Sequence, residues 1–204
     1  MPRLQREIEW FARQKIHMVF CCDANFGILK QDLEITQAMI SAKKRYGFPQ
    51  SFMIQSTKNV TERAYQIHSA LHEAQMNLSV TLSLQTLNPE ALKNVRRENI
   101  SLETYRELQR RFRKEKILTY TDILIGLPGE TYDSFANGIA QIIDEGQHHW
   151  IQFYNVYVLP NAQMADPHYR QQHAIETVIT PYVFSQDPLN PLRDDISEWQ
   201  EMLI

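Results

Sequence analysis

The chain has 204 residues, 43% hydrophobic and 22% charged, which is ordinary for one soluble globular domain with a substantial core. Its formal net charge of −3 gives no electrostatic basis for binding nucleic acid or an anionic membrane. No apolar run approaches the roughly 18 residues of a membrane span, and charged residues begin at Arg3, so no signal peptide is indicated. We therefore predict a cytoplasmic protein.

The chain opens with the pattern of an amphipathic helix over its first sixteen residues, followed by a β-rich run at 17–22. A strand in this position lacks a neighbour on one side, so its exposed edge is a predicted site for a partner chain or for self-association. The run contains the only two cysteines, Cys21 and Cys22. Adjacent residues on a strand point to opposite faces, and we expect both to be small buried residues.

Further β-rich runs alternate with segments of helical periodicity. Strands are predicted at 51–56, 78–85, 120–126 and 150–159. Apolar residues at helical spacing between Val60 and Ala74, and between Leu102 and Phe112, predict helices. A short extra helix is predicted at 89–96, where Asn88 is followed by Pro89, and Ser101 is predicted to cap the next helix.

Comparable points at the strand ends recur at the length of a βα unit. They are separated by 32, 30, 41 and 29 residues and are Asp23, Gln55, Gln85, Gly126 and Asn155. Repeats of this length predict a parallel sheet with right-handed crossovers. Ligands of such sheets bind beyond the carboxyl ends of the strands, where this chain is polar each time: DANFG, QSTKN, SLQTLN, GLPGE and YNVYVLPN. The sequence therefore predicts a ligand site there.

Three other features lie outside this pattern. From residue 166 onward the chain is rich in proline and shows no βα repeat, which predicts a barrel over 1–165 and an irregular extension over 166–204. His68 and His72 have a spacing that zinc can use, but they lack the glutamate of a metalloprotease motif, so a surface pair is predicted. The unfinished appearance of both ends suggests the middle of a longer protein.

Four of these segments, in this order, resemble the radical S-adenosylmethionine (SAM) enzymes. The segments are FCCDANFGI (20–28), VTLSLQ (80–85), RREN (96–99) and DILIGLPGET (122–131). The resemblance is greatest to the subgroup that carries a cobalamin-binding domain ahead of the barrel. It implies an α/β fold, a partial (β/α) TIM-like barrel of parallel strands whose first strand is missing here.

The resemblance implies a SAM-binding role for residues at two strand ends. The turn containing Asp23, Asn25 and Gly27 is expected to meet the amino group of the methionine moiety. An Asx turn that caps the next helix is the alternative. Ser83 and Gln85, expected on one side of a strand, are assigned to ribose hydroxyls or the methionine carboxylate, with polar filling of the barrel interior as the alternative.

In the family, the loop after the next strand supports adenine. Gly126 and Gly129 are expected to let the backbone approach a flat ligand closely, because neither has a Cβ. The family pattern is G-x-I-x-G-x-x-E; Asp122 replaces its first glycine, and Glu130 falls one residue late.

Two further cofactor-binding residues are implied at neighbouring positions. Arg97 matches a basic residue whose guanidinium can clamp a carboxylate, and a solvated helix-end arginine is the alternative. Asn155, with Tyr157 and Asn161, is expected to form the floor of the pocket.

The family's chemistry needs a [4Fe–4S] cluster held by three cysteines in C-x-x-x-C-x-x-C, and this chain has only two adjacent cysteines. No metal ligand is therefore assigned, and no cobalamin-binding domain is recognised. The first hypothesis is the SAM-binding part of a radical SAM enzyme with a small-molecule substrate, inactive as an isolated chain. The alternatives are a cluster-free nucleotide-binding or scaffold protein acting with a partner chain, and an unrelated barrel that binds phosphate at GLPGE.

Overall fold

The structure is a computed structural model that describes residues 1–57, 62–181 and 199–204. The chain folds into two compact units. The first unit comprises Met1–Leu84, Asn99–Asp122 and Ala140–Gln152, and the second comprises Gln85–Glu98, Ile123–Ile139 and Phe153–Ile204. Each unit is described by itself.

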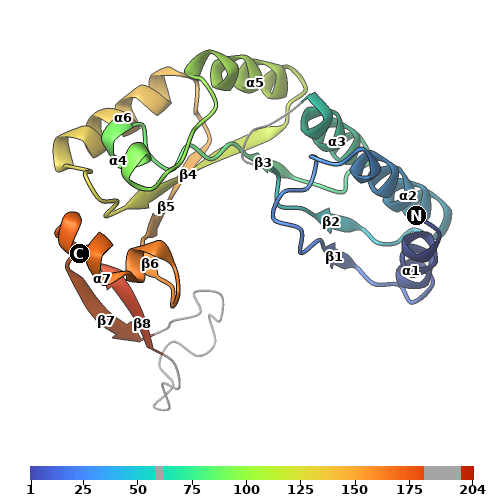
Figure 1. Cartoon of the computed structure of the whole chain (residues 1–204). Coiled ribbons are helices and arrows are strands. Elements are labelled where there is room, and N and C mark those ends of the chain that lie inside the picture. Colours follow the sequence, from blue (N-terminus) through green and yellow to red (C-terminus); the bar gives the residue numbers. More distant parts are fainter. Residues whose placement is uncertain (58–61, 182–198) are drawn as a thin grey trace. The chain divides into compact units, whose positions relative to one another are not determined.

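The first unit begins with two parallel strands and three helices. The order is α1 (Pro2–Arg13), β1 (Met18–Phe20), α2 (Lys30–Tyr46), β2 (Ser51–Met53) and α3 (Glu62–Glu73). Helix α2 packs on α1 and on α3, beside the β1–β2 pair (Figure 1). Phe20 is the register partner of Met53 in this parallel pair. Apolar side chains from the helices and from β2 form its core, including Met39, Phe52, Ile67 and Leu71.

The rest of the first unit surrounds β3 (Ser79–Thr81), α5 (Leu102–Lys114) and parts of β4 (Leu118–Ile125), α6 (Tyr132–Asp144) and β5 (Trp150–Asn155). Strands β3, β4 and β5 form one sheet in that order, and β3 and β4 are parallel. On β4 the polar side chains of Thr119 and Thr121 are buried. They bond to Gln109 and Tyr105 of α5, which satisfies polar groups whose burial would otherwise cost free energy.

The second unit contains α4 (Pro89–Asn94) and a separate antiparallel sheet. This sheet has the order β6-β8-β7, formed by β6 (Tyr157–Val158), β8 (Trp199–Leu203) and β7 (Thr177–Pro181). A 3-10 turn, η1 (Gln163–Ala165), and helix α7 (Pro167–Gln172) precede β7. The carboxylate of Asp166 caps α7 by accepting from two backbone N–H groups.

The alternation of strand and helix and the parallel pairing were predicted from sequence and are confirmed. Asn88 and Ser101 cap α4 and α5 as expected. The expectation of an irregular segment after residue 166 was wrong for the described residues: α7, β7 and β8 lie there. Strands β7 and β8 pair with each other although residues 182–198 separate them in the chain. Local periodicity cannot reveal a pairing between such distant segments. Val60 of the third predicted helix lies outside the described residues.

Two predictions about individual side chains were also wrong. His68 is 2% exposed and does not lie on the surface. Its ring lies on the buried side of α3, where it hydrogen-bonds with Ser56. Cys22 is exposed and Cys21 only partly buried, because β1 itself is not covered: Met18 and Phe20 are also exposed. None of the helices in the described residues is long and apolar enough to cross a bilayer.

Candidate functional site

The turn after β1 is held by carboxylates of its own segment. Asp23 Oδ1 accepts a hydrogen bond from the Asn25 backbone N–H at 2.9 Å, which is an Asx turn. The buried Asp32 carboxylate accepts from the N–H groups of Gly27 and Leu29, at 2.8 and 2.9 Å. The Asx-turn alternative is therefore present, but Asp32, not Asp23, caps α2. Asp23 and Asn25 remain exposed at the tip of the turn.

Gly27 needs to be glycine for protein packing. Its φ is +107°, and a Cβ built there would lie 3.1 Å from the Cβ of Ala64 on α3. Both the backbone conformation and the close approach disfavour a side chain. The turn is consequently pre-shaped against α3, and little conformational entropy remains to be lost when a ligand binds.

The strand end after β2 carries a polar cluster around the buried His68 that sequence reasoning missed. Its members are Ser56, His68 of α3 and Asn77, which precedes β3. Ser56 Oγ hydrogen-bonds His68 Nε2, and Asn77 Nδ2 lies 3.2 Å from His68 Nδ1. Burial lowers the pKa of His68 from 6.5 to about 4, so the ring is neutral at pH 7. The only signal in the sequence was a histidine within an apolar helical stripe.

Ser83, at the end of β3, donates to Asp122 of β4, with Ser83 Oγ 2.9 Å from Asp122 Oδ2. Asp122 Oδ1 is also buried, and no hydrogen-bond partner for it exists among the described residues. Burial raises the pKa of this carboxyl above its usual range, and the Ser83 hydrogen bond partly opposes that shift. A half-buried carboxylate with one oxygen unmatched is suited to receive a hydrogen-bond donor. The signal for Asp122 in the sequence was that it stands where the family pattern has its first glycine.

Gln85 opens the second unit in a left-handed conformation, with φ of +65°. The strict alternation on which its predicted orientation rested therefore stops at Leu84. Its carbonyl accepts from the Leu124 N–H at 2.8 Å, which continues the pairing toward β4 after the regular part of β3 has ended. The backbone of Gln85 thus anchors this strand end beside the loop that follows β4.

Glu130 ties the loop after β4 to the segment that precedes α4. Its carboxylate accepts from the hydroxyls of Thr86 and Ser134 and, at 3.3 Å, from Asn88 Nδ2. Asn88 Nδ2 also donates to the Gly129 carbonyl at 3.0 Å. Because these donors occupy the carboxylate, Glu130 is placed to position the loop.

The two glycines of the same loop face other parts of the protein. Gly129 has φ of +89°, and an added Cβ would lie 2.7 Å from Asn94 Nδ2 on α4. Gly126 has φ of +91°, and its added Cβ would lie 3.5 Å from the Leu203 Cβ on β8. The backbone conformation therefore accounts for both glycines, and close packing adds a second reason at Gly129 alone. The carbonyl of Pro128, which accepts from Asn94 Nδ2 at 3.0 Å, further fixes the loop.

Arg97 follows α4 and is half-buried. Its Nε is buried and has no hydrogen-bond partner among the described residues, and no ion pair there includes it. Burial lowers the pKa of the guanidinium, as expected when no anion compensates for lost hydration. A half-buried guanidinium with only Nε buried and unpaired is compatible with both the carboxylate clamp and the solvated arginine.

The last predicted site residue, Asn155, is the exposed final residue of β5. The next residue, Val156, donates to the Ile125 carbonyl at 3.2 Å and accepts from the Leu203 N–H at 2.9 Å. Tyr157 and Asn161 are also exposed, and Asn161 has φ of +64°.

The structure joins the predicted residues in local groups. In the first unit, the Asp23–Gly27 turn lies beside the β2 end through a parallel bridge between Phe26 and Ser56, and Ser83 pairs with Asp122. In the second unit, the backbone of Gln85, the Glu130 network and both loop glycines belong to one strand-end region.

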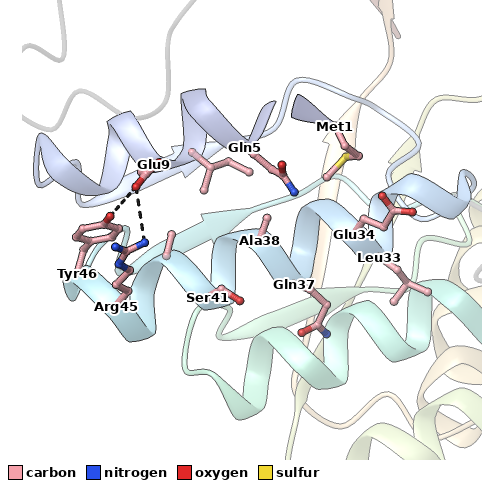
Figure 2. A pocket seen from close by; sticks show the side chains of 12 residues that line it. Met1, Gln5, Glu9, Leu33, Glu34, Gln37, Ala38, Ser41, Arg45 and Tyr46 are labelled. Atoms are coloured by element: carbon pink, nitrogen blue, oxygen red, sulfur yellow. Dashed lines mark hydrogen bonds and ion pairs between the residues drawn. The ribbon is translucent and has the colours of Figure 1, made fainter. Parts of the chain in front are cut away.

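A groove of about 620 Å³ between α1 and α2 is a different feature (Figure 2). Glu9 of α1 lies at one end of it, 2.7 Å from the Tyr46 hydroxyl and 3.8 Å from Arg45 Nη1. The hydrogen bond from Tyr46 lowers the pKa of Glu9, and the hydrogen bond and positive charge of Arg13 lower it further. None of the predicted site residues lines this groove. In the described residues no three His, Cys, Asp or Glu side chains gather as a metal site.

Comparison with known proteins gives relatives in both sequence and structure. The cobalamin-dependent radical SAM methyltransferase TokK of Streptomyces tokunonensis is 39% identical over 202 residues, which are 99% of this chain and 29% of the relative. The 2-(S-pantetheinyl)-carbapenam-3-carboxylate methyltransferase of Streptantibioticus cattleyicolor is 38% identical over 202 residues, again 99% of this chain and 29% of the relative. Over nearly its whole length, this chain is similar to a segment of a radical SAM methyltransferase.

The solved structures agree with this similarity at the level of fold. The radical SAM methyltransferase TsrM of Kitasatospora setae, solved with tryptophan and a SAM analogue, has a TM-score of 0.56 and 17% identity, covering 74% of this chain and 29% of that chain. The radical SAM enzyme HemN of Escherichia coli has a TM-score of 0.54 and 14% identity, covering 86% and 45%. No protein-family model matches. This chain spans less than a third of the length of the two curated relatives that it matches.

The residues present fit SAM but not its iron–sulfur partner. Arg97 and Asp122 each hold a buried polar atom without a partner, one cationic and one an acceptor, and both types suit a zwitterionic, hydroxyl-bearing ligand. A [4Fe–4S] cluster needs three or four cysteine ligands, and this sequence offers two adjacent ones. The cluster therefore does not fit these residues.

Proposed function

We propose that this chain is the SAM-binding portion of a cobalamin-dependent radical SAM methyltransferase that acts on a small molecule in the cytoplasm. The observation that carries the proposal is the 39% identity to TokK over 202 residues, because that match includes every candidate site residue. When bound in the full-length protein, a [4Fe–4S] cluster and cobalamin would supply the redox and methyl-transfer chemistry. The isolated chain is expected to bind SAM without turning it over.

The proposed roles follow from the chemistry of each side chain. Asp23 and Asn25 offer exposed oxygen acceptors to the ammonium of the methionine moiety. Asp122, already bonded to Ser83, accepts from a ligand hydroxyl through its unmatched Oδ1.

Arg97 binds the methionine carboxylate, which would offset the cost of burying a guanidinium without an anion. Gln85, the loop of Gly126 and Gly129, and Asn155 are the remaining residues proposed to contact SAM. Glu130 holds the loop in place.

Isothermal titration of the isolated chain with SAM tests the proposal. We expect binding that weakens about tenfold or more in Arg97→Ala, since a charged hydrogen-bonded contact contributes on the order of 1.5–3 kcal/mol. Arg110→Ala is the matched control, because Arg110 is exposed and pairs only with Glu107 on its own helix. No detectable SAM binding, or equal loss in both variants, contradicts the proposed function.

Catalytic silence is tested separately by anaerobic reconstitution with iron and sulfide. We expect no stoichiometric [4Fe–4S] signal in electron paramagnetic resonance from the isolated chain, because only Cys21 and Cys22 are available as thiolate ligands. A SAM-responsive cluster signal from this chain would refute that part of the proposal while leaving SAM binding intact.

A further inference from the structure

In the polar cluster of Ser56, His68 and Asn77, the direction of each hydrogen bond can be assigned. The Ser79 backbone N–H can only donate, and it lies 3.2 Å from Asn77 Oδ1, so this oxygen is the acceptor. The amide nitrogen of Asn77 therefore faces His68 Nδ1, at 3.2 Å. Since an amide NH₂ can only donate, Nδ1 of the imidazole must accept.

A neutral imidazole carries one proton, so His68 then holds it on Nε2. Nε2 is the atom bonded to Ser56 Oγ. His68 consequently donates to Ser56, and the serine oxygen is the acceptor. This direction rules out His68 as a base that withdraws the Ser56 proton in the resting protein.

The proton of the Ser56 hydroxyl is thereby free to point elsewhere. No acceptor for it occurs among the described residues, and the serine is half-buried. A hydroxyl that accepts one hydrogen bond becomes a better donor in the next, because successive hydrogen bonds polarise one another. Ser56 is thus prepared to donate to an acceptor that is not among the described residues.

The residues around Ser56 indicate what kind of ligand group would accept this hydrogen bond. A parallel bridge joins Ser56 to Phe26, with Phe26 N–H donating to the Gln55 carbonyl at 3.0 Å and Thr57 N–H to the Phe26 carbonyl at 3.2 Å. Ser56 therefore lies beside the exposed Asp23 turn. A carboxylate that attracts an ammonium, next to a hydroxyl whose proton is not engaged by the described residues, matches the two charged groups of an α-amino acid end.

We propose that Ser56 is a ligand-binding residue that donates a hydrogen bond to the α-carboxylate of an amino-acid-type ligand, with His68 and Asn77 as its positioning residues. The inference rests on the proposed function, in which that ligand is SAM.

Titration of the wild-type chain and Ser56→Ala with SAM and with decarboxylated SAM tests the proposal. We expect Ser56→Ala to bind SAM about tenfold more weakly and to bind decarboxylated SAM as tightly as the wild type does. Ser41→Ala, at an exposed position on α2, should change neither affinity. Equal weakening for both ligands, or none, overturns the role of Ser56. If the wild-type chain binds no SAM, the proposed function fails and this inference fails with it.

The positioning role has its own readout. Nitrogen-15 chemical shifts of His68 should show the proton on Nε2, and a proton on Nδ1 would overturn the assigned direction. His68→Gln keeps an N–H donor for Ser56 and should retain the preference for SAM over decarboxylated SAM. His68→Leu should lose that preference. A purely structural histidine would change both affinities alike.

Discussion

Gly129 lies so close to Asn94 that any side chain at this position collides with it: a built Cβ would be 2.7 Å from Asn94 Nδ2 and 3.2 Å from the Cγ of Glu90. The contact joins the loop after β4 to α4, and Asn94 Nδ2 also donates to the Pro128 carbonyl. The shape of this loop is therefore built into the protein before any ligand is considered.

Replacing Gly129 with alanine should destabilise the chain by about 2 kcal/mol, because a left-handed backbone penalty adds to the loss of the Asn94 hydrogen bond to the Pro128 carbonyl when the Asn94 amide moves aside. Gly47→Ala is the matched control. Gly47 also has a positive φ, +78°, but a Cβ there meets nothing within 4 Å, so only the backbone penalty of about 1 kcal/mol applies. Urea unfolding of both variants measures the difference, and equal losses would contradict the steric explanation.

Leu203 of β8 packs on Gly126 and is 7% exposed, whereas its neighbour Ile204 is 72% exposed. Leu203→Ala should cost about 2–4 kcal/mol of unfolding free energy, because it removes a buried side chain and leaves a cavity. Ile204→Ala should change stability by less than about 0.5 kcal/mol. Similar small effects in both variants would show that β8 contributes little to the second unit.

The burial of His68 predicts how stability depends on pH. Its pKa is about 4 in the folded chain and 6.5 when unfolded, so the unfolded state binds the proton more readily. The stability is fully present above pH 6.5 and falls as the pH drops from 6.5 toward 4, by up to about 3 kcal/mol. The side chains in contact with the ring, Ser56, Asn77 and Phe112, carry no charge, and burial is the cause of the shift.

Chemical denaturation at pH 7 and pH 5 of the wild-type chain and of His68→Gln measures this effect. The wild type should lose more free energy of unfolding between the two pH values than the variant does. His72→Gln, on the same helix but partly exposed, is the control and should keep the wild-type slope. A wild-type slope that persists in His68→Gln would assign the pH dependence to other groups.

The sequence was sufficient for the order of the elements and for the caps at Asn88 and Ser101, because these depend on local periodicity and side-chain hydrogen bonds. It failed for His68, whose burial depends on Ser56 and Asn77 at distant positions in the chain. It failed for β8 because this strand pairs with residues 177–181, beyond the gap of 182–198. The contact of the loop glycines with a ligand stays a prediction, and the sequence could not show their protein neighbours, Asn94 and Leu203, because these depend on tertiary packing.

Asp122 combines a cost in stability with a proposed benefit in binding. Burial raises its pKa above the unfolded value of 3.8, so the folded chain binds this proton more readily. The corresponding stability is present below pH 3.8 and is lost as the pH rises through the folded pKa, which leaves an unfavourable buried carboxylate at pH 7. Asp122→Asn keeps an oxygen acceptor for the Ser83 hydroxyl and removes the charge, so we expect it to stabilise the chain at pH 7.

The same variant should bind SAM about tenfold more weakly, because a neutral amide is a poorer acceptor for a ligand hydroxyl than a carboxylate. Calorimetric titration and urea unfolding of one preparation measure both quantities. The exposed Asp133→Asn on α6 is the control and should change neither. Greater stability with unchanged SAM affinity would mean that Asp122 is a structural carboxylate, and weaker binding with lower stability would mean that the loss reflects unfolding. Only higher stability together with weaker SAM binding supports Asp122 as a ligand-binding carboxylate on β4.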